Sequence, residues 1–150
     1  MNRIFKKFLS LFLVLILAFG CFSLVSFAAS DDVLTFKVVD GSAVVSTCDK
    51  NAKGTVVVPS VTTIKGKSYS VKSIGDGAFE NCKKITSISI AEGVSSIGSR
   101  AFANCTALTD VYIPQSLVLC QYTAFNGCGA VTVHCYSSNY QFFTVYGINQ

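Results

Sequence analysis

The chain has 150 residues, of which 51% are hydrophobic, and a formal net charge of +4. Three of its twelve cationic residues lie within residues 1–7, whereas all eight acidic residues lie from Asp31 onward, so nine cations face eight anions over the rest of the chain. This near-neutral balance excludes a strongly basic nucleic-acid-binding protein. The length predicts one domain with a modest hydrophobic core.

Residues 1–28 have the pattern of a secretory signal peptide. Residues 1–7 carry three positive charges, residues 8–27 contain no charged residue, and small residues follow at Ala28 and Ala29. Cleavage after Ala28 is expected because Ser26 and Ala28 supply the small side chains that the peptidase requires. The protein is therefore predicted to be secreted, extracellular or associated with the cell surface.

Two other interpretations of this leader stay open. The apolar run is long enough to span a bilayer, so an uncleaved leader would anchor the protein in the membrane. A lipoprotein signal ending at Cys21 is the weakest interpretation, because Phe19 is bulky where such signals have small residues. No other contact with a membrane is predicted.

The remaining residues 29–150 are predicted to form one domain that begins with a β-hairpin cap over residues 29–54. Residues 34–39 and 42–46 flank Asp40-Gly41, a strong two-residue hairpin signal. A cap is expected because the open end of a stack of strands exposes apolar side chains and unpaired backbone groups.

A 23-residue repeat occupies the centre of the chain. Residues 71–93 (VKSIGDGAFENCKKITSISIAEG) and 94–116 (VSSIGSRAFANCTALTDVYIPQS) are identical at ten positions, and residues 117–136 continue the same register. The repeat predicts stacked coils over residues 55–135. The residues that recur at this spacing include Phe79, Phe102 and Phe125, and Cys82, Cys105 and Cys128.

Each coil is predicted to contain one strand and one short helical turn, which makes the expected fold a mixed α/β solenoid. Residues 87–90 and 110–113 alternate polar and apolar side chains, as strands with one buried face do. The segments GDGAFENC and GSRAFANC are interpreted as helical turns with Asp76 and Ser99 as N-caps. The recurring phenylalanines are expected to form one continuous buried column.

The position before each recurring cysteine is Asn81, Asn104 or Gly127. These residue types tolerate the left-handed backbone conformation best, so each is predicted to end its turn in that conformation.

The chain is predicted to close with a last strand at residues 131–135 and a C-terminal cap at residues 136–150. The cap is expected to contain a helix that starts at Ser137 or Ser138 and stops at Gly147. Its aromatic side chains are expected to lie against the final coil; they are Tyr140, Phe143 and Tyr146.

The pattern SIGxxAFxxC, followed by an alternating strand and in one copy by Ile113-Pro114, resembles the BspA-type (treponemal) class of leucine-rich repeats. The resemblance extends upstream to residue 32 and into the terminal segment. It implies a first strand over residues 55–59 and a loop insertion over residues 64–69 with a turn at Lys65-Gly66-Lys67. It implies a short leucine-rich-repeat array in a secreted bacterial protein, and adhesion to host or extracellular-matrix proteins or to other cells.

Six cysteines remain after the leader, an even number that is compatible with disulfides in an exported protein. The repeat argues instead that Cys82, Cys105 and Cys128 are buried thiols that fill space between coils. Cys120 takes the place of an isoleucine, which also indicates packing. A disulfide between Cys120 and Cys128, or one that involves Cys48, stays open.

No catalytic site, metal site or cofactor is predicted. Zinc sites need closely spaced pairs of cysteine or histidine ligands, and the sequence lacks them. A nucleophilic cysteine needs a base, and the single histidine, His134, is expected to point outward while the recurring cysteines point inward. The sequence also lacks the common hydrolase, phosphate-binding and metalloprotease motifs.

The outward face of the predicted sheet is the candidate binding surface. In register, Val57, Ser89, Tyr112 and His134 form one row, and Thr55, Ser87, Asp110 and Thr132 form the next. The candidate protein-binding residues are Ser87, Ser89, Asp110, Tyr112, Thr132 and His134.

Two functions follow from this surface. One is a secreted or surface-associated protein-binding or adhesion module, whose partner is an extracellular or host-matrix protein. The alternative is a structural or accessory envelope protein, a degenerate repeat paralogue without a specific ligand. Plain solvated strand residues would suit the second function equally well.

Overall fold

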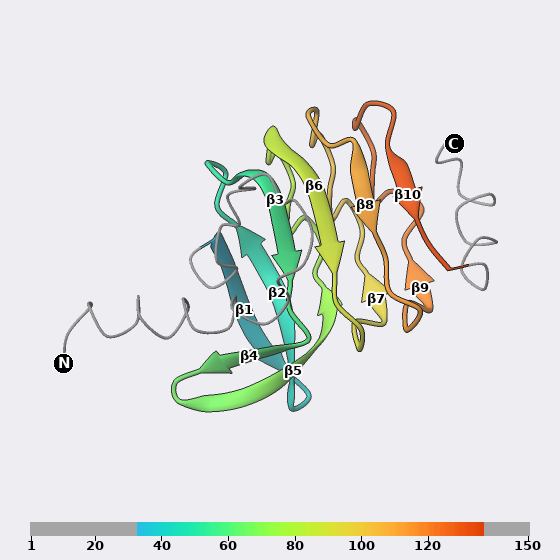
Figure 1. Cartoon of the computed structure of the whole chain (residues 1–150). Coiled ribbons are helices and arrows are strands. Elements are labelled where there is room, and N and C mark those ends of the chain that lie inside the picture. Colours follow the sequence, from blue (N-terminus) through green and yellow to red (C-terminus); the bar gives the residue numbers. More distant parts are fainter. Residues whose placement is uncertain (1–32, 137–150) are drawn as a thin grey trace, which may run out of the picture.

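The computed structural model describes residues 33–136. Residues 34–136 form strands and turns, with no helix, and the strands belong to two sheets that run side by side through the molecule (Figure 1). The strands are β1 (Leu34–Val39), β2 (Ser42–Cys48), β3 (Lys53–Val58), β4 (Val61–Ile64), β5 (Lys67–Ile74), β6 (Lys84–Ile90), β7 (Ser96–Ile97), β8 (Asp110–Tyr112), β9 (Leu119–Cys120) and β10 (Thr132–His134). The predicted leader and the predicted helix after Ser137 or Ser138 lie outside the described residues.

One sheet has the order β1-β2-β5-β7-β9, with β4 paired to β5. Strands β1 and β2 form the predicted antiparallel hairpin, and Asp40 and Gly41 at its turn have φ angles of 49° and 75°. Such positive angles at both turn positions match the right-handed twist of the flanking strands. The hairpin prediction is therefore confirmed, and β2 joins the repeat by parallel pairing with β5.

The other sheet contains β3, β6, β8 and β10, all parallel. Val57 lies opposite Ser89, Ser89 opposite Tyr112, and Tyr112 opposite His134. The second row, from Thr55 to Thr132, is aligned in the same way. The predicted strands and both predicted rows are confirmed. This sheet carries the candidate surface.

The structure has two strands in each coil where the sequence predicts one. Strands β5, β7 and β9 form a second parallel ladder, in which Ile74 pairs with Ile97 and Ile97 with Cys120. Strands β7 and β9 are two residues long, too short for an alternating pattern to be recognised. The predicted loop at residues 64–69 is also a hairpin, because β4 and β5 pair across a turn with left-handed Lys65 and Gly66.

The helical turns were a wrong prediction, and the mixed α/β class with them. The amide of Phe79 donates to the Ala101 oxygen of the next coil at 2.7 Å, and the amide of Phe102 donates to the Ala124 oxygen at 2.8 Å. The amide of Asn81 also donates to the next coil, to the Ala103 oxygen at 2.8 Å, whereas in an α-helix capped at Asp76 it would donate to the Gly77 oxygen four residues earlier. Asp76 likewise caps no helix, since its carboxylate accepts a hydrogen bond from the Ser99 amide of the next coil at 2.7 Å.

The backbone conformation at the end of each turn is as predicted. Asn81, Asn104 and Gly127 have φ angles of 63°, 58° and 74°. Asparagine and glycine are the residues that adopt this left-handed conformation at least cost. The sequence thus predicts the left-handed conformation correctly, although this conformation ends a turn and not a helix.

The core lies between the two sheets and under the turns. Phe79, Phe102 and Phe125 stack with ring centroids 5.0 Å apart at each step, which confirms the predicted column. Phe79 and Phe102 are completely buried, whereas Phe125 at the end of the column is partly exposed. Val56, Ile88 and Val111 point into this core from the four-stranded sheet. The alternate residues of the same strands therefore face outward.

Candidate functional site

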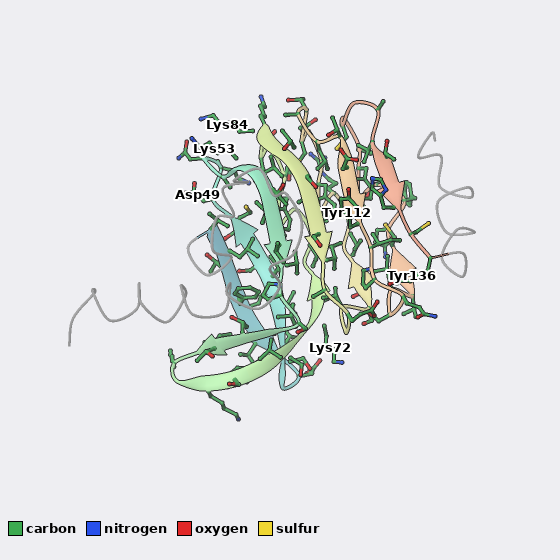
Figure 2. All side chains as sticks on the ribbon, in the orientation of Figure 1. Asp49, Lys53, Lys72, Lys84, Tyr112 and Tyr136 are labelled. Atoms are coloured by element: carbon green, nitrogen blue, oxygen red, sulfur yellow. The ribbon has the colours of Figure 1, made fainter. Side chains whose placement is uncertain are left out.

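The outward face of β3, β6, β8 and β10 changes in character from one edge to the other. Val57 and Ser89 on β3 and β6 are half-buried and small, whereas Tyr112 and His134 on β8 and β10 are exposed. The tyrosine is 46% exposed, an unusual fraction for a large aromatic residue. Figure 2 places Tyr112 on this face of the ribbon.

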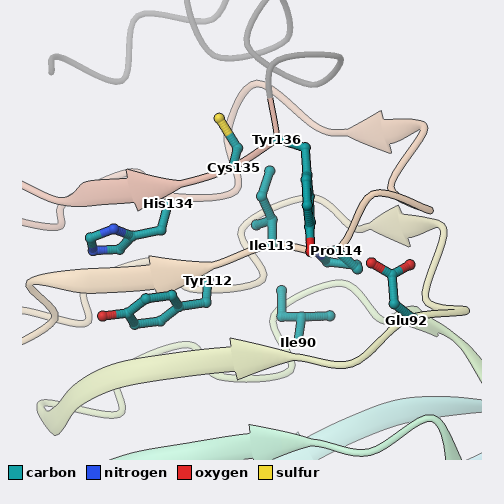
Figure 3. Close-up of a pocket in the computed structure, with 8 residues that line it drawn as sticks. All are labelled: Ile90, Glu92, Tyr112, Ile113, Pro114, His134, Cys135 and Tyr136. Carbon is teal, nitrogen blue, oxygen red and sulfur yellow. The ribbon is translucent and has the colours of Figure 1, made fainter.

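Tyr112 and His134 form a stacked pair. Their ring centroids are 4.2 Å apart and their planes differ by 8°. Parallel pairing of β8 with β10 sets the two side chains next to each other, and both rings lie on the same side of the sheet in Figure 3. Both residues remain exposed, so the stacked pair projects from the sheet into solvent.

Asp110 fixes the position of the histidine ring. Its Oδ1 atom lies 2.8 Å from His134 Nε2, and its Oδ2 atom accepts a hydrogen bond from the Thr109 hydroxyl at 2.8 Å. The bond to His134, followed by the bond from Thr109, lowers the pKa of Asp110. The carboxylate is therefore held in its charged form beside the aromatic pair.

A shallow hollow of about 410 Å³ lies beside the aromatic pair, where β6, β8 and β10 end. Its floor is apolar, and Tyr112 and Tyr136 stand at its sides (Figure 3). Its lining residues are Ile90, Glu92, Tyr112, Ile113, Pro114, His134, Cys135 and Tyr136.

Glu92 places a second carboxylate at the rim of the hollow. Its Oε1 atom accepts a hydrogen bond from the Gln115 amide at 2.8 Å, and its Oε2 atom accepts one from the Ser116 amide at 3.2 Å. The bond from the Gln115 amide is the main cause that lowers the pKa of Glu92, and the bonds from Ser116 add to it. Glu92 thus ties the loop after β6 to the loop after β8, and its charge remains near the surface.

The six predicted site residues divide into two groups. His134 contacts both Asp110 and Tyr112, and Tyr112 and His134 line the hollow. Ser87, Ser89 and Thr132 share the rows but make no contact with the hollow. Glu92 and Tyr136 were missed, because they follow their strands and the alternating pattern ends there.

The cysteines lie on the interior side of the coils. All six cysteines in the described residues are free, and Cys82 and Cys105 are fully buried. The thiol of Cys105 donates to the Phe79 oxygen at 3.1 Å, and that of Cys128 donates to the Phe102 oxygen at 3.0 Å. The prediction of buried thiols is confirmed for Cys82 and Cys105, whereas Cys128 is only partly buried.

Two further cysteines, Cys48 and Cys120, are also buried thiols. Cys48 is buried, and its hydrogen bond with the Cys82 thiol, together with burial, raises its pKa. Burial alone raises the pKa of Cys120 to about 12. These thiols are therefore protonated at neutral pH, as packed core side chains are expected to be.

The part of the chain that the structure describes contains no cluster of three or more metal-ligating side chains. Within the same residues, 33–136, no helix is long and apolar enough to cross a membrane.

Comparisons with known proteins bear on the whole stack of coils. Residues 58–146 match the family described as the BspA type leucine-rich repeat region, in six copies. No curated protein matches the chain.

Several solved structures of bacterial repeat proteins resemble the chain. A leucine-rich cell-surface protein from Faecalibacterium prausnitzii is 30% identical with a TM-score of 0.50, over 67% of this chain and 26% of that protein. A leucine-rich repeat protein from Bacteroides ovatus is 29% identical with a TM-score of 0.56, over 73% and 37%. A third, from Bacteroides capillosus, is 26% identical with a TM-score of 0.52, over 69% and 94%. The match thus covers only about a quarter of the first of these proteins and just over a third of the second.

Proposed function

Because this chain belongs to the BspA-type leucine-rich repeat family, we propose that it is an exported protein-interaction module that binds through the outward face of β3, β6, β8 and β10. The observation that carries this proposal is the exposed stack of Tyr112 on His134, held by Asp110. Exposed aromatic side chains beside a hollow are typical of the residues that dominate binding energy at protein interfaces.

The chemistry of the face suits a protein partner. The stacked rings of Tyr112 and His134 offer apolar area, and ordering them costs little conformational entropy on binding because aromatic side chains have few rotatable bonds. Asp110 and Glu92 add two charged acceptors at opposite sides of the aromatic pair and the hollow. A partner segment with an apolar side chain flanked by donors or positive charge would complement this surface.

Export and surface association are supported by two independent features. Residues 1–28 have the pattern of a signal peptide, and the F. prausnitzii relative is a cell-surface protein. The proposed partner is therefore an extracellular or host-matrix protein, and adhesion is the proposed role. In this proposal residues 29–54 and 136–150 serve as caps of the repeat coils.

The small size of the face sets the expected strength of binding. Four parallel strands spaced by about 4.8 Å give a sheet about 15 Å wide between its outer strands. This is smaller than a standard protein interface, so single contacts are expected to be weak and multivalent attachment to be stronger.

The proposal is tested by measuring saturable binding of the processed protein to purified matrix proteins and to envelope fractions. Tyr112→Ala and His134→Ala are expected to reduce binding, because each removes half of the aromatic stack. Tyr122→Ala is the matched control, since Tyr122 is 70% exposed but lies outside the sheet strands.

Loss of binding in the Tyr112 and His134 variants, with the Tyr122 variant unchanged, supports an adhesion module. Binding that is equal in all three variants excludes this face. Absence of saturable binding to every fraction favours the alternative, a structural or accessory envelope protein without a specific ligand.

A further inference from the structure

A cluster of lysines lies away from the aromatic pair, where β3 and β6 begin. Lys53 and Lys84 are paired residues of the two neighbouring strands, and Figure 2 shows them at the same corner of the molecule. Lys83 precedes Lys84, and Lys50 lies in the turn before β3. All four side chains are exposed. Since neighbouring strands are about 4.8 Å apart, several of these ammonium groups can reach one ligand.

The carboxylates near this lysine cluster have other partners. Glu80 forms an ion pair with Arg100 at 2.5 Å. Asp49 accepts a hydrogen bond from the Asn51 amide at 2.9 Å. Lys50 bonds to the backbone oxygen of Glu80 and not to a carboxylate. Within residues 33–136, none of the four lysines forms an ion pair. The neutral Asn51 amide leaves the negative charge of Asp49 in place, so the four lysines give the corner an excess of positive charge over this one carboxylate.

The fold does not require these lysines. Like charges directly opposite each other on neighbouring strands are destabilising, and Lys53 opposite Lys84 is such a pair. In the next repeat the positions of Lys83 and Lys84 are taken by Thr106 and Ala107, in a coil with the same strand and turn. The positive charge therefore has a cost in stability that the packing of the coils does not explain.

We propose that Lys50, Lys53, Lys83 and Lys84 form a binding site for a sulfated extracellular polysaccharide. Lysine is a compact, strongly hydrated point charge, whereas arginine is the usual choice for bidentate recognition of phosphate. The four-residue cluster contains no arginine, and segments 48–54 and 80–86 contain no aromatic side chain on which a base could stack. These features favour a flexible chain of fixed negative charges over a nucleic acid.

This inference uses the export of the protein but not its aromatic face. The two surfaces are therefore separable by mutation. A polysaccharide bound at the lysine corner would hold the protein at a cell or matrix surface while the aromatic face remains free for a protein partner, an arrangement in which two weak contacts give a stronger attachment.

The test measures the affinity of the processed protein for heparin, as the probe, at several salt concentrations. The double variant Lys53→Gln/Lys84→Gln is expected to bind about tenfold or more weakly at physiological salt, with the slope of log K against log salt reduced by about two. The matched control is Lys65→Gln/Lys67→Gln, which removes the same charge from the turn between β4 and β5 and from the first residue of β5. It is expected to change the affinity by less than about twofold, because its charges lie outside the cluster.

Three results would overturn the proposal. Equal losses in both double variants would mean that only net charge matters. Binding of polyphosphate or of hyaluronan, which lacks sulfate, as tight as that of heparin would exclude a sulfated ligand. A lower unfolding midpoint for Lys53→Gln/Lys84→Gln would mean that the lysines have a structural role, since relief of repulsion should leave the midpoint unchanged or raise it.

A failure here is distinguishable from a failure of the protein-binding face. Tyr112→Ala should retain full affinity for heparin, and Lys53→Gln/Lys84→Gln should retain affinity for the protein partner. A loss of heparin binding in Tyr112→Ala would place the polysaccharide on the aromatic face and contradict the lysine site.

Discussion

The turns and the outward sheet face repeat at the same spacing, but only the turns carry the same residue types in successive coils. The turns place a phenylalanine at every step, in a column of rings 5.0 Å apart. The outward row changes at every step, from Val57 to Ser89, Tyr112 and His134. A side chain in the turns must fit the coil before and after it, whereas an outward side chain meets solvent. The repeated positions therefore specify the fold, whereas the unrepeated outward positions are free to vary and are the ones to which we assign binding in our proposal.

The largest expected effect is that of Phe102→Ala on stability. Phe102 is fully buried and stacks on a ring at each side, so the variant should lose about 3–5 kcal/mol of unfolding free energy in urea titration. Phe125→Ala is the control at the end of the column, where the ring is partly exposed and one described phenylalanine stacks on it. Its loss should be clearly smaller; equal losses would contradict the graded packing of the column.

The second effect concerns the close approach of neighbouring coils. A Cβ atom at Gly98 would lie 2.4 Å from Asp76 Oδ1 and 2.8 Å from the Asp76 amide nitrogen. Gly98→Ala should therefore cost about 1–3 kcal/mol of unfolding free energy, as overpacking usually does. At Gly129 nothing lies within 4 Å of such an atom, so Gly129→Ala should leave the urea midpoint unchanged or raise it. A similar loss at both positions would refute the argument from contact distances.

The third effect separates inner from outer cysteines by their rate of alkylation. Cys105 is fully buried, and its hydrogen bond with Cys128 and its burial raise its pKa. Cys135 is partly exposed at the hollow. Iodoacetamide followed by mass spectrometry should label Cys135 in the native protein and Cys105 only after denaturation. Native labelling of both at the same rate would show that the thiols in the turns are not packed.

The smallest effect is electrostatic and belongs to the outward face. His134→Ala removes the main hydrogen bond that lowers the pKa of Asp110, so that pKa should rise toward its ordinary value. A carboxyl group whose pKa is lower in the folded state stabilises the fold at pH values above its unfolded-state pKa. This stabilisation is lost as the pH falls through the folded-state pKa. The carboxyl ¹³C shift of Asp110, followed against pH, measures the change, with Thr132→Ala as the control in the same row. An unchanged titration in His134→Ala would contradict the pairing.

Much of the fold was predictable because contacts between coils repeat in the sequence. The phenylalanine column, the hairpin at Asp40-Gly41 and the left-handed Asn81 and Asn104 each follow from residue type and spacing. The turns were mistaken for helices because their apolar residues and caps suit a helix, whereas the amide of Phe79 bonds to the next coil. No single repeat reveals a hydrogen bond that is made only when two repeats stack.

The outward rows of the candidate site could be predicted from the sequence, but the residues that line the hollow could not. The alternation along β8 and β10 places Tyr112 and His134 outward. Glu92 reaches the rim through the amides of Gln115 and Ser116 in another coil, and no local pattern indicates that contact. Cys48 was also missed as a neighbour of Cys82, because the β4–β5 hairpin lies between them and interrupts the 23-residue spacing.

The most direct test of the central claim is to measure binding and unfolding together for Tyr112→Ala. Saturable binding to the protein partner should fall, while the unfolding free energy should stay within about 0.5 kcal/mol of the unmodified protein, as for most surface substitutions. Unchanged binding at unchanged stability would contradict the claim that the unrepeated outward residues carry the function.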